Sequence, residues 1–173
     1  MTVRVYLPAT VRRLGAMLET GRTTPVSGLA FAVTTELADT SAGSSADSSM
    51  TADQEELEYL AMRDAARASL RLLTGDPEAA RRGVIAVDVS AARERGDLER
   101  AAVEVSGDVA WSAVAAVHID ADDAVDAVRA AIGAVDAADM GDLDADFVVG
   151  AAEDFELAWY APSEARYRVA ELI

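Results

Sequence analysis

Apolar side chains follow strand-like patterns in four to five short stretches of the chain. Residues 3–9 alternate, with Val3, Val5 and Leu7 on one face, and Pro8 marks the end of this stretch. Residues 28–34 are almost continuously apolar, which is typical of a strand buried on both faces. The other predicted strands lie within 83–90, 98–107 and 109–120, and the last of them ends near Ile119.

Helical spacing of the apolar residues marks other stretches. Thr10 is a suitable N-cap for a helix over residues 11–20, which Gly21 is expected to end. A longer helix is predicted between Asp53 and Gly75, because acids crowd its first turn and arginines its second half. Its apolar stripe consists of Tyr59, Met62, Ala66, Leu70 and Leu73, widened by Leu57, Leu60 and Leu72.

Two more helices follow, and together with the strands they predict the fold class. Asp120 is expected to cap the third helix, and the fourth lies within residues 142–160. The order of these elements predicts an α+β (mixed α/β) fold, with one mixed sheet of about 4–5 strands covered by about four α-helices. We expect one globular domain over residues 1–173, with a flexible Ser-rich loop at about 39–52.

The composition excludes several kinds of chemistry. The chain has no cysteine, which rules out disulfides, thiol catalysis and cysteine-ligated metal sites. His118 is its only histidine, so a Ser-His-Asp hydrolase would depend on that one imidazole. No glycine-rich stretch has the spacing of a phosphate-binding loop. The sequence therefore predicts no cofactor, and it contains no convincing catalytic set.

Negative charge is concentrated in one part of the chain. The net charge is −16, and residues 120–157 contain twelve acids against the single base Arg129. Such a surface repels nucleic-acid phosphates and anionic membranes, so neither is an expected partner. It suits a protein partner with a basic surface, or it only keeps an alanine-rich surface soluble. The N-terminal residues lack the order of a signal peptide, so we expect a cytoplasmic protein.

Several segments together resemble a known family. These are RVYLPAT at the start, FAVT at 31–34, EELEYLAMRDAARASLRLL at 55–73, AVHID at 116–120 and EDFELAWYAPSE at 153–164. They are similar to a small family of uncharacterised actinobacterial proteins known only as a domain of unknown function. The resemblance implies a cytoplasmic actinobacterial protein and supplies neither an activity nor catalytic residues.

Four acids near the C-terminus have the spacing of a calcium-binding loop. Asp142, Asp144, Asp146 and Glu153 occupy ligand positions one, three, five and twelve. Position six, however, requires a glycine for its sharp turn, and Phe147 stands there. The alternative is a helix capped by Asp142 or Asp144. Its apolar stripe would contain Leu143, Phe147, Val148, Ala151 and Phe155 as part of the core, and we prefer this interpretation.

Three further groups of residues are candidate sites. His118 lies two residues before Asp120, so the two side chains share a strand face, where a carboxylate-held imidazole would serve as a general base. The alternative is a partly buried histidine beside a capping aspartate. Arg63, Arg67 and Arg71 form a stripe at four-residue spacing whose mutual repulsion calls for compensation. Either a bound anion or the acids of residues 120–157 would provide it, and the acids require no ligand.

Trp159 and Tyr160 are the last candidates, as aromatic anchors for a partner or as residues that close the core beside Pro162.

Two hypotheses on function follow. The first is a non-catalytic binding or regulatory module that acts through its acidic helical surface. The second is a small-molecule-binding protein or enzyme with a pocket between the His118–Asp120 strand end and the helix that carries Glu56, Tyr59 and Arg67.

Overall fold

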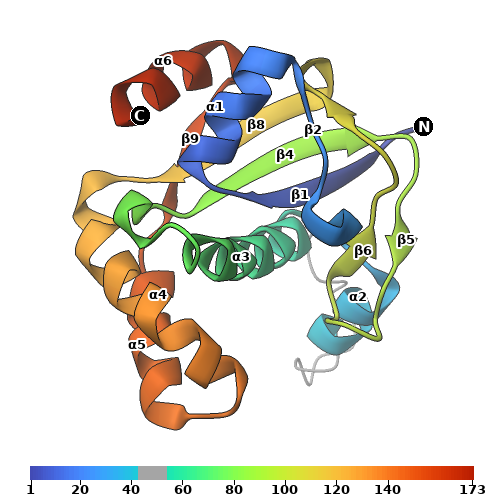
Figure 1. The fold of residues 1–173 in the computed structure, drawn as a ribbon. Coiled ribbons are helices and arrows are strands. Elements are labelled where there is room, and N and C mark those ends of the chain that lie inside the picture. Colours follow the sequence, from blue (N-terminus) through green and yellow to red (C-terminus); the bar gives the residue numbers. More distant parts are fainter. Residues whose placement is uncertain (43–53) are drawn as a thin grey trace.

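The protein is built around an antiparallel sheet with helices on both faces (Figure 1). A computed structural model describes residues 1–42 and 54–173. The main sheet has seven strands in the order β5-β6-β3-β1-β4-β8-β9, and β2 and β7 form a separate two-stranded ribbon. The strands are β1 (Val3–Ala9), β2 (Arg22–Thr23), β3 (Leu29–Phe31), β4 (Gly83–Val89), β5 (Arg93–Glu94), β6 (Ala102–Glu104), β7 (Val109–Ala110), β8 (Val114–Asp120) and β9 (Leu157–Tyr160).

Six α-helices lie within the described residues, and they confirm the α+β class but not the expected numbers of elements. The helices are α1 (Val11–Thr20), α2 (Thr35–Ala42), α3 (Gln54–Leu73), α4 (Val125–Asp139), α5 (Leu143–Glu153) and α6 (Pro162–Leu172). The prediction of about 4–5 strands and four helices was wrong because it lacked the two-residue strands, α2 and α6, and because it placed β9 in a helix. None of the described helices is both long and apolar enough to cross a bilayer.

The first helix forms where local signals predict it. The side chain of Thr10 accepts a hydrogen bond from the backbone N–H of Arg13 at 3.2 Å. Gly21 ends the helix with a φ of 76°, in the left-handed region that glycine enters without steric cost. The predicted bounds, 11–20, are those of α1, because short-range hydrogen bonds decide them.

The expectation of a mixed sheet was wrong, since every pairing in the described sheet is antiparallel. The reason lies in the strand order. Helix α3 connects β3 to β4, but β1 lies between these two strands and pairs with both. Strands β3 and β4 therefore run in the same direction without being neighbours.

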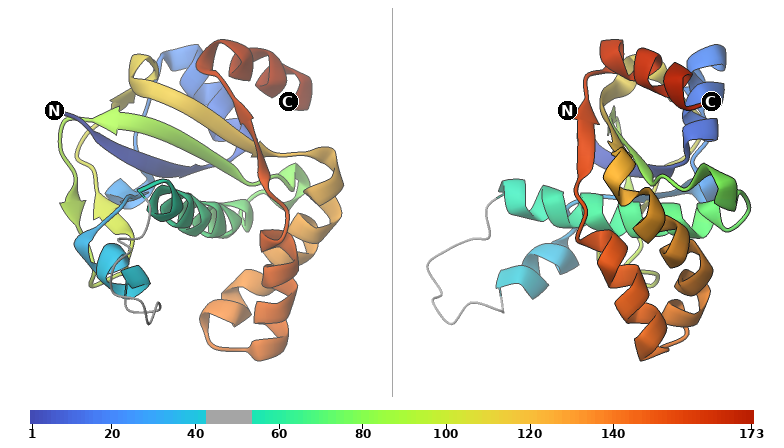
Figure 2. Two further views of the ribbon diagram at one scale, coloured as in Figure 1. Left: turned by 180° about the vertical axis from the view of Figure 1, so that it is seen from behind. Right: turned by 90° about the vertical axis from the view of Figure 1, so that its left-hand side faces the viewer.

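Two layers of helices cover the sheet (Figures 1 and 2). On one face, β-strand residues such as Val5, Ile85 and Val117 pack with Leu14 of α1 and Val169 of α6. On the opposite face lies α3, whose Leu57, Ala61 and Ala65 pack with Tyr6, Phe31 and Val84 of the sheet. Small side chains on α3 let its backbone approach the sheet closely. Tyr59, which we placed in the buried stripe, is 41% exposed.

Helices α4 and α5 form a hairpin that projects away from the sheet in all three views (Figures 1 and 2). A third core, at the end of α3, holds the base of this hairpin through Leu70, Leu73, Val128, Val135 and Val149. We expected Asp120 to cap α4, but it does not. Asp120 is the last residue of β8, and its carboxylate is buried elsewhere. A short 3-10 turn precedes α4 instead.

The Ser-rich segment predicted at 39–52 falls mostly outside the described residues. Its first part, through Ala42, is helical, because α2 begins at Thr35, where we expected only a brief turn. At the C-terminal end, residues 157–160 form a strand and not part of the fourth helix, because Leu157 to Tyr160 pair with β8 along the sheet edge.

Candidate functional site

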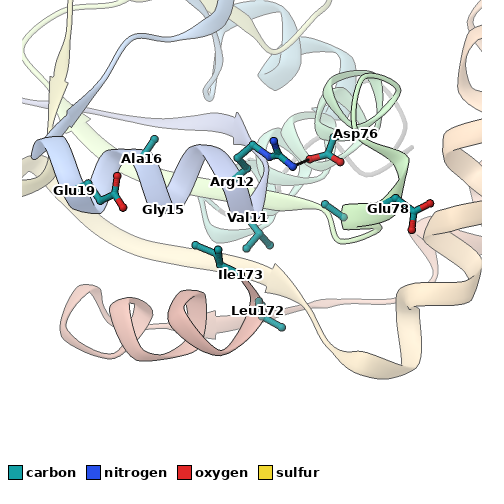
Figure 3. A pocket seen from close by; sticks show the side chains of 10 residues that line it. Val11, Arg12, Gly15, Ala16, Glu19, Asp76, Glu78, Leu172 and Ile173 are labelled. Atoms are coloured by element: carbon teal, nitrogen blue, oxygen red, sulfur yellow. Dashed lines mark ion pairs between the residues drawn. The ribbon is translucent and has the colours of Figure 1, made fainter.

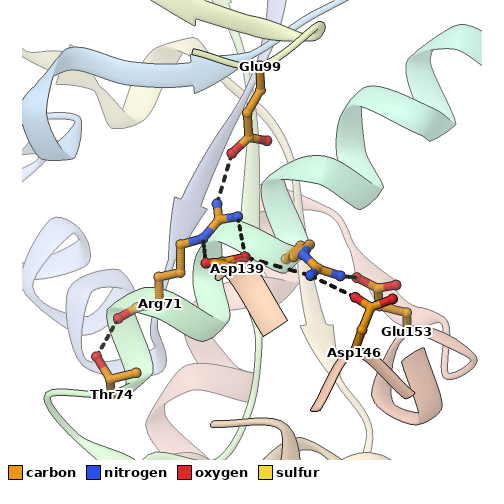
Figure 4. A network of polar contacts seen from close by, with 7 residues as sticks. Arg71, Thr74, Glu99, Asp139, Asp146 and Glu153 are labelled. Atoms are coloured by element: carbon orange, nitrogen blue, oxygen red, sulfur yellow. Dashed lines mark hydrogen bonds and ion pairs between the residues drawn. The ribbon is translucent and has the colours of Figure 1, made fainter. Parts of the chain in front are cut away.

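The α4–α5 hairpin is tied to α3 by arginine–carboxylate pairs (Figure 4). The acids lie beside the hairpin turn, at Asp139 and Asp146, and at its open end, at Glu153. The guanidinium of Arg67 donates to Glu153 and Asp146 at 3.1 Å each, and lies 3.6 Å from Asp139. Arg71 donates twice to Asp139, at 2.7 and 3.1 Å, and once to Glu99 at 3.1 Å. Two members of the arginine stripe thus have carboxylate partners within the protein.

This network also shifts the titration of its members. The hydrogen bonds from Arg71 hold the pKa of Asp139 below its usual value, more than burial raises it. The same contacts raise the pKa of Arg71. Arg63, the third member of the stripe, differs, since within residues 1–42 and 54–173 it has no acid partner and lies over the Tyr59 ring at 6.0 Å.

The four acids with calcium-loop spacing have separate roles. Asp142 caps α5, accepting from the backbone N–H of Ala145 at 2.9 Å. Asp146 and Glu153 accept from Arg67, and Asp144 is exposed in the first turn of α5. In the part of the chain that the structure describes, no three acidic or histidine side chains gather as a metal site would require.

The tip of the hairpin exposes three large apolar side chains. Met140, Leu143 and Phe147 are 83%, 83% and 82% exposed. Our interpretation of Leu143 and Phe147 as core residues was therefore wrong. The face of α5 that packs is the one carrying Val149 and Ala152, and the tip extends past the third core. Leu143 and Phe147 lie one turn apart on α5, so they form a continuous apolar surface.

Acidic side chains surround this apolar tip, which we define as Met140, Leu143 and Phe147. Asp136, Asp142 and Asp144 are all exposed, and none of them forms an ion pair with any described residue. Gly141 adopts a φ of 95°, which lets the chain reverse tightly between α4 and α5. The tip is therefore an apolar surface with exposed carboxylates that form no ion pair in the described chain, on a hairpin that Arg67 and Arg71 tie to α3.

His118 and Asp120 share a sheet face, as expected, but their surroundings differ. Asp120 is 1% exposed and accepts three hydrogen bonds from Arg82, at 2.7, 2.8 and 2.7 Å. Burial lowers the pKa of His118, and among the described residues its side chain has no hydrogen-bonding partner. The structure thus commits the Asp120 carboxylate to Arg82. Sequence reasoning missed Arg82, which no motif marks.

The space between β9 and α3, where we expected a pocket, is small. A crevice lined by Tyr59, Arg63, Arg82 and Leu157 has a volume of about 20 Å³. This is room for about one water, whereas ligand pockets generally measure about 300–1,000 Å³. Glu56 is exposed on α3, and Arg67 turns toward the hairpin instead.

The two aromatic candidates lie on the edge strand β9 and point to opposite faces of the sheet. Trp159 pairs with His118 across the strands and is 59% exposed. Tyr160 packs against the core beneath α1 and α6. Only Trp159 is therefore available to a partner.

A cavity of about 530 Å³ lies at the opposite side of the sheet, between α1, the end of α6 and the turn at Pro77–Ala79 (Figure 3). Arg12 and Asp76 form an ion pair of 2.9 Å at one side of it, and Glu19 stands at the other. None of the candidate residues from the sequence lines this cavity. Its walls come from three separate segments, so no local motif indicates it.

Comparison with known proteins identifies the family. Residues 3–169 match the family described as "Family of unknown function (DUF6912)", and the chain belongs to it. This confirms the resemblance to a domain of unknown function. No curated protein and no solved structure matches the chain.

Proposed function

We propose that the protein is a non-catalytic binding module that docks a basic protein segment onto the apolar tip of the α4–α5 hairpin. The exposure of Met140, Leu143 and Phe147 is the observation that carries this proposal. Clustered apolar side chains at a protruding point cost solubility unless a partner covers them. In this proposal the protein acts in the cytoplasm.

The charge around the tip selects the kind of partner. Asp136, Asp142 and Asp144 offer carboxylates without intramolecular ion pairs in the described chain, and a partner with lysines or arginines beside an apolar anchor complements them. A second copy of this chain would bring the same carboxylates face to face. Nucleic acids and anionic lipids would meet like charge as well.

The attachment of the hairpin to α3 supports the same proposal. Arg67 and Arg71 hold α4 and α5 on α3, so the tip is presented by a preorganised element. A preorganised surface loses less entropy on binding than a mobile one. By contrast, the crevice beside Tyr59 is too small for the pocket that the small-molecule hypothesis requires.

The test uses a synthetic amphipathic peptide of leucines and lysines and a matched peptide in which glutamates replace the lysines. We expect the lysine peptide to bind in isothermal titration calorimetry and the glutamate peptide not to bind. Phe147→Ser should weaken binding by about tenfold or more, since a central aromatic anchor contributes at least about 1.4 kcal/mol. Leu98→Ser, at another exposed leucine, should leave it unchanged.

Charge is tested separately on the same hairpin. Asp144→Asn should weaken binding of the lysine peptide, whereas Asp154→Asn, at the far end of α5, should change it less. If the lysine peptide binds Phe147→Ser as tightly as it binds the unmodified protein, attraction is only diffuse and the docking proposal fails. Equal binding of the glutamate peptide would contradict the charge argument.

A further inference from the structure

A polar cavity beside the hairpin base brings three arginines together. It has a volume of about 220 Å³ and is lined by Leu60, Arg63, Asp64, Arg67, Arg100 and Glu153. The α3 residues form one wall, Glu153 at the end of α5 forms another, and Arg100 comes from the turn between β5 and β6. Arg100 lies 33 or more positions beyond these α3 residues in the sequence, so the stripe alone does not predict the site.

The three guanidiniums are not equally engaged. Arg67 is committed to Glu153 and Asp146. Among the described residues, Arg63 contacts the Tyr59 ring and forms no ion pair. Arg100 and Asp64 form an ion pair of 3.8 Å, which is too long for a hydrogen bond. Within the described chain, Arg63 and Arg100 therefore form no hydrogen bond to a carboxylate, while both line one cavity.

The carboxylates of the cavity restrict the ligand further. Burial raises the pKa of Asp64, and Arg100 and Arg63 offset this only in part. A fully ionised anion would meet repulsion from Asp64 and Glu153, but an anion with a hydroxyl hydrogen can donate it to a carboxylate. At about 30 Å³ for each water, the volume equals roughly seven waters, enough for a phosphate group.

We propose that this cavity binds a small oxyanion that keeps one hydroxyl hydrogen, of which hydrogenphosphate is the simplest. Arg63 and Arg100 donate to its charged oxygens, and Asp64 accepts its hydroxyl hydrogen. Guanidinium groups match oxyanions well because their donors lie in a fixed plane. The site is separate from the hairpin tip and does not depend on the docking proposal.

The experiment is calorimetric titration with inorganic phosphate, sulfate and methyl phosphate at neutral pH. We expect phosphate to bind at millimolar concentration or below and sulfate, which has no hydroxyl hydrogen at this pH, to bind at least about tenfold more weakly. Methyl phosphate, a monoester whose second pKa is about 6, has mostly lost its last hydroxyl hydrogen at neutral pH, so we expect it to bind about as weakly as sulfate. Methyl phosphate binding as tightly as phosphate would point to a monoester ligand and would contradict the need for a hydroxyl hydrogen.

Variants test the individual roles. Arg63→Gln and Arg100→Gln should each weaken phosphate binding about tenfold, while Arg129→Gln, at an exposed pair on α4, should not. Asp64→Asn should reduce the preference for phosphate over sulfate. Because Arg63 has no ion pair in the described chain, the Arg63→Gln variant should have the melting temperature of the unmodified protein. A loss of phosphate binding in this variant then cannot be ascribed to unfolding.

Three results would overturn the proposal: no phosphate binding at millimolar concentration, equal affinity for sulfate, or unchanged affinity in both arginine variants. Phe147→Ser serves as a control for the docking proposal, since it should bind phosphate as the unmodified protein does. The two proposals therefore fail on different observations.

Discussion

Two arginine–carboxylate clusters on the α3 side of the protein use the same chemistry at different depths. Arg82 and Asp120 have side chains only 2% and 0% exposed, and they satisfy each other in a closed pair, with Arg82 also donating to the Phe155 carbonyl at 2.8 Å. Arg67 and Arg71 are 24% and 32% exposed, and they share Asp139 between them.

The difference teaches where a charged cluster retains capacity for binding. The Arg82–Asp120 pair is buried, and its role is to join the start of β4 to the end of β8. The Arg67–Arg71 cluster borders solvent, and around it remain Arg63, Arg100 and the apolar tip. Burial thus separates a pair that only holds the fold from a cluster that holds the hairpin and also borders solvent.

Breaking the buried Arg82–Asp120 pair should lower the free energy of unfolding more than any other substitution considered below. Asp120→Asn leaves the buried Arg82 guanidinium without its counter-charge, which should lower the free energy of unfolding by about 3–5 kcal/mol. Urea denaturation measures this change. The matched control is Asp122→Asn, since Asp122 is exposed and pairs with Arg81 at 2.7 Å.

We expect Asp122→Asn to cost at most about 1 kcal/mol. Replacing both members of the buried pair, with Arg82→Met and Asp120→Leu together, should recover much of the lost stability. Equal losses in Asp120→Asn and Asp122→Asn would show that burial does not make the Arg82–Asp120 pair more important for stability than an exposed pair.

Removing Arg67 from the more exposed cluster should lower the free energy of unfolding by less. Arg67→Gln removes the shared cation from Asp139, Asp146 and Glu153 and should lower stability by about 1–2 kcal/mol after solvent screening. For a chain of this length, that corresponds to a fall of roughly 2–8 °C in melting temperature. An unchanged melting temperature would argue against the pairing, and Arg129→Gln supplies the exposed control.

The single histidine, His118, lies two residues before Asp120 and should make the stability of the protein depend on pH. Because burial lowers the pKa of His118, the unfolded chain binds a proton at a higher pH than the folded protein does. Stability should therefore fall as pH decreases through the unfolded histidine pKa of about 6.5, and continue to fall until the folded pKa is passed.

The measurement compares unfolding free energies at pH 8 and pH 5.5 in the unmodified protein and in His118→Gln. The variant should lose less stability over this interval. A single imidazole NMR titration gives the folded pKa directly, and a value above 6.5 would contradict the burial argument.

The hairpin tip should show the smallest effect on stability. Phe147→Ser changes a side chain that is 82% exposed, so the free energy of unfolding should change by less than about 0.5 kcal/mol. Thermal denaturation checks this. A loss of several kcal/mol would mean that Phe147 packs within the fold, and the tip would then be no binding surface.

The elements that sequence predicted correctly are those decided by neighbouring residues. Thr10 and Gly21 bound α1 through contacts within a few residues, and Asp142 caps α5 in the same way. The strand β9 was predicted as helix because its residues directly follow the apolar stripe that ends at Phe155, and only pairing with the distant β8 makes them extended. Tertiary contacts here override local preference.

The candidate site was predictable only in part for the same reason. The arginine stripe and the acids of residues 120–157 are visible in the sequence, and so is their complementarity. Which acid meets which arginine depends on how α4 and α5 pack on α3. The exposure of Leu143 and Phe147 could not be read from spacing, because an apolar stripe looks the same whether or not the core reaches it.

The central place of β1 has a consequence for how the chain folds. Its pairing with β4 joins Val3 to Val89 and Ala9 to Gly83, so the earliest strand of the sheet must wait for residues more than seventy positions later. Closing so long a loop carries an entropic cost before any contact repays it, and topologies rich in such pairings fold slowly. During synthesis, the first strand therefore stays without one of its two neighbours until α3 and β4 have emerged.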